Sequence, residues 1–116
     1  MTGGFTEHCE AEFEFLARKN PARLLALVSG ELRNRPELLT FAAEWAGRID
    51  STSAVVRALL PLLRHEDPAV REGAIYGLQR HLDRSIEART TLRALAEGDP
   101  SPGVRESARD ALAGLD

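Results

Sequence analysis

The feature that most restricts the fold of this chain is an internal repeat. The segment PAVREGA at residues 68–74 recurs 34 residues later as PGVRESA at residues 102–108, and Leu78 recurs as Leu112. A fainter copy begins 32 residues earlier, where Pro36 takes the place of Pro68. A period in the low thirties is typical of a helical pair that stacks on its neighbours. The repeat therefore predicts an α-solenoid.

Segments of helix-forming residues, separated by proline and glycine, predict about seven helices with short connections. The 116 residues include 17 Leu and 17 Ala but only six aromatic residues, and apolar residues recur at three- and four-residue spacing. Asn20, Asp67 and Ser101 each precede a proline, which predicts three capped helix starts. Gly47 and Gly98 are expected to end helices in the left-handed conformation. The predicted helices cover residues 6–19, 21–32, 36–47, 53–64, 68–83, 86–97 and 102–115.

This organisation predicts a single domain over residues 1–116. Residues 6–19 match no repeat, so we expect an N-terminal capping helix in which Cys9 is a small buried apolar residue. The remaining chain divides into a degenerate repeat at 21–48 and two regular repeats at 53–83 and 86–115.

Two pairs of residues predict how neighbouring repeats pack. Gly73 and Gly77 lie four residues apart in one helix, a spacing that permits close approach of a second helix. Phe41 and Trp45 lie on the flank of their helix that faces the previous unit, where packing between repeats explains them better than ligand stacking.

The best-defined repeat resembles a HEAT repeat of the short bacterial type. DPAVREGA at residues 67–74 follows LLPLL at residues 59–63, and Pro61 stands where the family bends its first helix. The resemblance implies that Asp67 and Arg71 form polar ladders between repeats; in the last unit Arg105 matches, but Ser101 replaces the aspartate. It also implies an all-α, right-handed solenoid of antiparallel helix pairs, whose most frequent role is protein–protein interaction.

The second helices of the pairs offer a candidate binding surface. A turn of about 100° per residue places one set of side chains of the helix at 68–83 inward and another outward. The inward set is Val70, Ala74, Ile75, Leu78 and Leu82, and the outward set is Glu72, Tyr76, Gln79 and Arg80. In the family that this chain resembles, second helices line the concave side of the solenoid. The outward residues at matching positions, our predicted partner-binding residues, are Glu44, Arg48, Glu72, Tyr76, Arg80, Glu106 and Asp110.

The chemistry of this surface favours a protein partner. Four acidic residues against two basic ones disfavour phosphate binding, and an outward Tyr76 among charges is typical of protein interfaces. The alternative is nucleic-acid binding through a basic convex edge formed by first-helix arginines, namely Arg23, Arg57, Arg64, Arg89 and Arg93.

Catalytic and metal chemistry have little support in the sequence. His65-Glu66 is similar to the histidine–glutamate pairs of HEAT-like di-iron hydroxylases, but it occurs once and in a turn. His8, Cys9 and His81 add no metal-ligand spacing, and neither a nucleophile motif nor a phosphate-binding glycine loop occurs. We therefore expect no enzymatic activity, no metal and no cofactor.

Charge and hydropathy indicate where the protein is located and which partners it does not bind. Eighteen acidic and fifteen basic residues give a net charge of −3, too mild for wholesale capture of nucleic acid or anionic membrane. There is no secretory signal, and the longest apolar stretch, at 58–63, is far below the roughly 20 residues of a membrane span. We expect a cytoplasmic protein, monomeric or weakly dimeric, that acts as an adaptor or as an immunity-like inhibitor of a toxin or enzyme. Fourteen arginines among the fifteen basic residues favour a GC-rich bacterial source.

Overall fold

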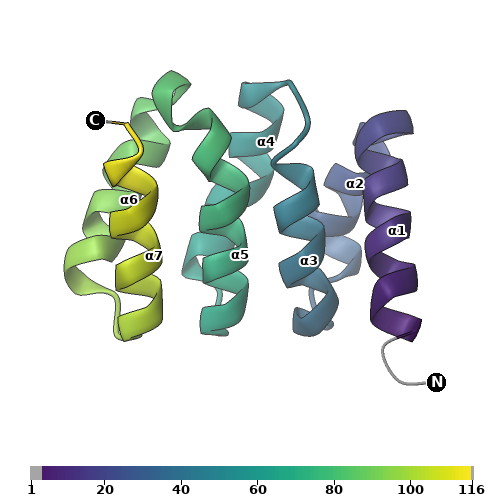
Figure 1. The fold of residues 1–116 in the computed structure, drawn as a ribbon, viewed down its shortest axis with the longest axis horizontal. Coiled ribbons are helices and arrows are strands. Elements are labelled where there is room, and N and C mark those ends of the chain that lie inside the picture. The colour runs from purple at the N-terminus through teal and green to yellow at the C-terminus, as the bar shows by residue number, and fades with distance from the viewer. Residues whose placement is uncertain (1–3, 116) are drawn as a thin grey trace.

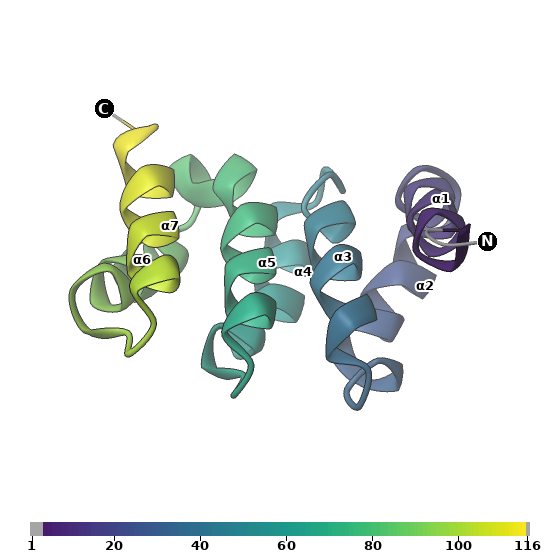
Figure 2. The same ribbon diagram turned by 60° about the horizontal axis from the view of Figure 1, so that its bottom comes forward.

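The computed structural model describes residues 4–115 and arranges them as two layers of helices. Figure 1 shows one layer in front, formed by α1 (Gly4–Lys19), α3 (Pro36–Ala46), α5 (Pro68–Leu78) and α7 (Pro102–Ala113). Behind it lie α2 (Pro21–Ala26), α4 (Thr52–Leu59) and α6 (Ile86–Gly98), and Figure 2 shows both layers from another side. The pairs α2–α3, α4–α5 and α6–α7 follow one another along the array. The predicted all-α solenoid is confirmed.

Helix α1 belongs to the layer of second helices. It packs beside α3 and against α2, so it occupies the place of a second helix at one end of the array. Among the α1 side chains that the structure describes, residues 9–19, Phe13 is the one that is buried, and Cys9 is only partly buried. This is the end at which the sequence predicts a cap.

The three capped helix starts are confirmed, and α3 and α6 end at Gly47 and Gly98 as expected, but the left-handed conformation predicted for the two glycines is wrong. Asn20, Asp67 and Ser101 each accept a backbone N–H of the following turn, at 3.2, 2.8 and 3.4 Å. Gly47 has φ −61° and ψ −19°, an ordinary right-handed conformation, and Gly98 also lacks a positive φ. Gly47 is needed for a close backbone contact, described below.

Three predicted helices end earlier than expected and continue as other turns. A π-helical turn, Leu27–Glu31, follows α2, and 3-10 turns follow α4 at Leu60–Arg64 and α5 at Gln79–Arg84. Pro61 explains why α4 gives way to a 3-10 turn, because proline has no N–H to continue the α-helical hydrogen bonds.

The turn after α5 places a buried histidine between repeats. His81 is 4% exposed, and its Nε2 donates to the carbonyl oxygen of Gly47 at 2.8 Å. Because Nε2 carries the hydrogen in the neutral ring, Nδ1 accepts from the Thr52 hydroxyl at 2.8 Å. The imidazole therefore ties the end of α5 to the connection between α3 and α4.

Helices α3 and α5 touch through their backbones. A Cβ atom on Gly47 would lie 2.2 Å from the carbonyl oxygen of Gly77, and one on Gly77 would lie 2.4 Å from that of Ala43. A Cβ on Gly73 would come within 2.8 Å of the carbonyl oxygen of Thr40. The close approach predicted from Gly73 and Gly77 is confirmed.

The repeat positions of Gly73 and Gly77 carry different side chains in the other second helices. In α3 they are Phe41 and Trp45, which are partly buried and line one hollow together with Glu10 of α1. In α7 they are Ser107 and Ala111. Side-chain size at these positions thus differs at each contact between neighbouring second helices.

A buried ion pair joins the last two repeats. Arg71 donates from Nε and Nη2 to the two carboxylate oxygens of Asp99, both at 2.9 Å, and the side chains are only 11% and 2% exposed. The Nη1 of Arg71 also donates a hydrogen bond to the carbonyl oxygen of His65 at 2.8 Å. Arg71 thus forms a polar contact between repeats, as the resemblance implies, whereas Asp67 caps its own helix and the carboxylate in the contact comes from Asp99.

Asp99 is held in its charged form. Burial alone would raise its pKa, but hydrogen bonds from Arg71 and from the backbone N–H of Ser101, with the charges of Arg71 and Arg105, lower the pKa below its usual value. A lowered pKa in the folded state stabilises the fold at every pH above the unfolded pKa, and this contribution is lost as the pH falls through the folded pKa.

Gly77→Ala is expected to destabilise the protein by about 1–3 kcal/mol, because the added methyl group collides with the α3 backbone. The matched control is Gly98→Ala, since no atom lies within 4 Å of its added Cβ. Urea unfolding compares the two variants. Equal stabilities would contradict the backbone contact.

Asp99→Asn is expected to cost roughly 3 kcal/mol at neutral pH, because it leaves the buried Arg71 without its counterion. The difference from the unmodified chain should begin to shrink as the pH falls below the unfolded pKa of about 3.9, because the unfolded chain then binds a proton while folded Asp99 is still charged, and it should disappear once the pH falls through the lowered folded pKa. Denaturant unfolding at neutral pH and at about pH 3 measures this. A difference that persists unchanged in acid would show that the charge of Asp99 is not what stabilises the fold.

Candidate functional site

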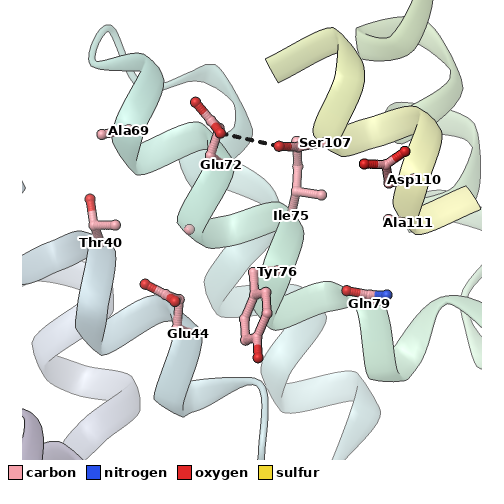
Figure 3. A pocket seen from close by; sticks show the side chains of 11 residues that line it. Thr40, Glu44, Ala69, Glu72, Ile75, Tyr76, Gln79, Ser107, Asp110 and Ala111 are labelled. Atoms are coloured by element: carbon pink, nitrogen blue, oxygen red, sulfur yellow. Dashed lines mark hydrogen bonds between the residues drawn. The ribbon is translucent and has the colours of Figure 1, made fainter. Parts of the chain in front are cut away.

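An open groove crosses the layer of second helices. A hollow of about 500 Å³ is lined by side chains of α3, α5 and α7, with Ile75 and Ala111 among its apolar residues (Figure 3). A second hollow of about 230 Å³ shares Glu44 and Tyr76 with the first and adds Arg48. We call the two hollows together the groove.

The repeat arranges the outward side chains of this face in three rows that run across the helices. The first row lies in the N-terminal halves of the helices, the second near their C-terminal ends and the third just beyond them. The rows are Thr40, Glu72 and Glu106; Glu44, Tyr76 and Asp110; and Arg48, Arg80 and Gly114. Acidic groups thus occupy the first two rows and basic groups the third.

Tyr76 stands at the centre of this arrangement. Its side chain is 54% exposed, one of the few large hydrophobic residues of the described chain that is not covered. Figure 3 shows it between Glu44 of α3 and Gln79. Exposed aromatic area beside an apolar floor is a common feature of protein-binding surfaces.

Glu72 is held in place by α7. Its Oε1 accepts a hydrogen bond from the Ser107 hydroxyl at 3.1 Å (Figure 3). Gly103 also approaches this carboxylate, since a Cβ there would lie 3.1 Å from Oε2. The positive end of the α7 helix dipole favours a carboxylate at this first turn.

Glu44 is a carboxylate in an unfavourable environment. Burial raises its pKa, and the charge of Glu10 on α1 raises it further. None of the four ion pairs among the described residues includes Glu44. The nearby Arg48 lies instead over the ring of Trp45, 4.4 Å from its centroid.

Six of the seven predicted partner-binding residues line the groove. Glu44, Glu72, Tyr76 and Asp110 line the larger hollow, and Arg48 and Arg80 line the smaller one. Glu106 is exposed on α7 outside both hollows. A binding role for these residues stays a prediction.

Several residues that line the groove were not among the predicted ones, and three of them show why. Ile75 and Ala111 are buried yet line the hollow, so an inward or outward assignment could not place them at its surface. Ser107 could have been found from the repeat, because it takes the position that Gly73 has in the preceding unit.

The predicted basic convex edge is only partly free. Arg23 forms an ion pair with Glu31, and Arg89 donates to the carbonyl oxygen of Leu82 at 2.6 Å. The other three, Arg57, Arg64 and Arg93, are exposed. Two of the five arginines are therefore engaged within the protein.

His65 has a local structural role. Its Nδ1 accepts the backbone N–H of Asp67 at 3.0 Å, as Asp99 accepts that of Ser101 in the next repeat. Within the described residues no three His, Cys, Asp or Glu side chains are placed to share a metal ion, and the side chain of His8 lies outside those described. No helix in the described part of the chain is both long enough and apolar enough to span a membrane.

Comparison with known proteins identifies a repeat family. The family model described as HEAT repeats matches residues 21–113, which include α2 through α7. Neither the curated proteins nor the solved structures contain a match to this chain.

Glu44→Gln is expected to raise the Tm at neutral pH by about 1–2 °C, a small effect because water screens this partly exposed group. Ionisation of a carboxyl group with a raised pKa costs stability above that pKa, and the cost vanishes as the pH falls below the unfolded value of about 4.3. The gain should therefore disappear in acid. Glu97→Gln, at an exposed position on α6, is the matched control. A lower Tm for Glu44→Gln at neutral pH would reveal a stabilising partner for the carboxylate.

Proposed function

This chain belongs to the HEAT-repeat family, and from that premise we propose that it is a non-catalytic module that binds a partner protein through the groove. HEAT repeats generally mediate protein–protein interaction. The surfaces that stacked helical repeats present are extended and rigid, which suits them to this role.

The observation that carries the proposal is the exposure of Tyr76. A tyrosine that is 54% exposed loses a large apolar area from water when a partner covers it, while its hydroxyl can still form a hydrogen bond. It lies centrally in the groove rather than at the rim, which is where residues that dominate binding energy are usually found.

The layer of second helices is large enough for a specific interface. A typical complex buries about 800 Å² on each partner. The molecule measures 39 × 29 × 23 Å, so its broad face exceeds that area. Packing of α3 on α5 through their backbones makes the face rigid, which lowers the entropy cost of binding.

Two biological roles fit such a module. An adaptor would bind its partner and leave the partner's activity intact, whereas an immunity-like inhibitor would abolish the activity of a toxin or enzyme at equimolar ratio. We place both roles in a bacterial cytoplasm. The activity of the captured partner, measured with and without this chain, separates them.

Tyr76→Ala is expected to weaken partner capture about fivefold or more, with helicity and Tm nearly unchanged. Glu72→Arg is expected to weaken capture as well, with a lower Tm because it removes the hydrogen bond with Ser107. The partner is first isolated by a photo-crosslinking residue placed at Gln79, an exposed position in the groove.

The matched control is Ile86→Ala, because Ile86 is 73% exposed on α6 in the other layer. If Ile86→Ala reduced capture and Tyr76→Ala did not, the groove would not be the interface. If Tyr76→Ala unfolded the protein, the assignment of this face would be wrong.

A further inference from the structure

We infer that the groove recognises an extended, basic segment of its partner, which crosses α3, α5 and α7 with arginine or lysine side chains over the first two rows. The inference rests on the proposed function and specifies the chemistry of the partner. It follows from the charges, the shape and the boundary of the groove.

The charge pattern favours a cation. The first two rows carry the carboxylates of Glu44, Glu72, Glu106 and Asp110 and no basic side chain. None of the ion pairs among the described residues uses any of these four groups. Their negative potential is therefore available to a partner, and it repels phosphate groups and acidic peptides.

The shape of the groove matches an arginine or lysine side chain. The methylene stem of such a residue packs on an apolar surface while its charged end stays polar, and Ile75 and Ala111 supply that surface. Glu72, fixed by Ser107, and Asp110 lie along the same hollow to receive the charge. The exposed ring of Tyr76 adds a face for cation–π contact.

The third row sets the direction of the segment. Arg48 and Arg80 lie beyond the C-terminal ends of their helices and line the smaller hollow. A basic segment that ran along one helix would pass from carboxylates to an arginine, whereas one that runs across the helices stays over acidic rows. Arg48 is held on the Trp45 ring, so this boundary is fixed.

Helix spacing sets the length of the segment. Neighbouring packed helices lie about 8–10 Å apart, so the path from α3 to α7 is roughly 16–20 Å. An extended chain rises about 3.3 Å per residue, which gives about five or six residues across the groove. Alternate side chains face the same way, so basic residues at alternate positions would all point into it.

The test uses the full chain and a fluorescein-labelled peptide about nine residues long in which arginine and alanine alternate. Fluorescence anisotropy at low salt is expected to show saturable binding, while peptides with glutamate or glutamine in place of arginine do not bind. Glu44→Gln, Glu72→Gln and Asp110→Asn are each expected to weaken binding about two- to fivefold, the effect of one exposed ion pair. Tyr76→Ala is expected to weaken it about two- to fivefold.

Glu87→Gln and Glu97→Gln are the matched controls, because both residues are exposed on α6, and they should leave the affinity unchanged. Equal losses in these controls and in the groove variants would overturn the inference, because the attraction would then come from net charge alone. Tight binding of the glutamate peptide, or no binding of the arginine peptide, would also overturn it. The proposed function would survive that result if Tyr76→Ala still reduced partner capture, so the two failures are distinguishable.

Discussion

The backbone contact between α3 and α5 is the constraint on which the rest of the structure depends. Gly47 and Gly77 leave no room for even one methyl group between these helices, so a side chain at either position would force them apart. At the repeat positions of Gly73 and Gly77 the other second helices carry larger side chains, Phe41 and Trp45 in α3 and Ser107 and Ala111 in α7. The residues at these two repeat positions therefore differ in size at each of the three contacts within the layer, which are α1 with α3, α3 with α5 and α5 with α7.

The groove depends on this packing and on what the repeat leaves at its surface. Ser107 anchors Glu72 from the neighbouring helix, and burial and the charge of Glu10 both raise the pKa of Glu44, so ionisation of Glu44 opposes folding. A carboxylate whose ionisation opposes folding, and which joins none of the ion pairs among the described residues, is consistent with a role in binding. Arg48 and Arg80 of the third row complement the negative C-terminal ends of α3 and α5, whereas Glu44 and Asp110 lie near the C-terminal ends of their helices, where the dipole disfavours a carboxylate.

The sequence predicted the layers and the outward face because the repeat fixes both. The alignment of the repeats places Glu44, Tyr76 and Asp110 at equivalent positions, and all three line the groove. It could not predict that Arg71 reaches Asp99, because a pairing across repeats depends on the path of the loop. The left-handed conformation expected at Gly47 is absent for a related reason: a glycine needed for close packing looks the same in sequence as one needed for a positive φ. Close packing does not account for Gly98, because no atom lies within 4 Å of a Cβ added there.

The most direct test of this account is an amide chemical-shift map of the full chain during titration with the alternating arginine peptide. The account predicts shifts confined to α3, α5 and α7, centred on Glu44, Tyr76 and Asp110, with the amides of α4 and α6 unchanged. Shifts centred on the other layer, around Arg57 or Arg93, would contradict it.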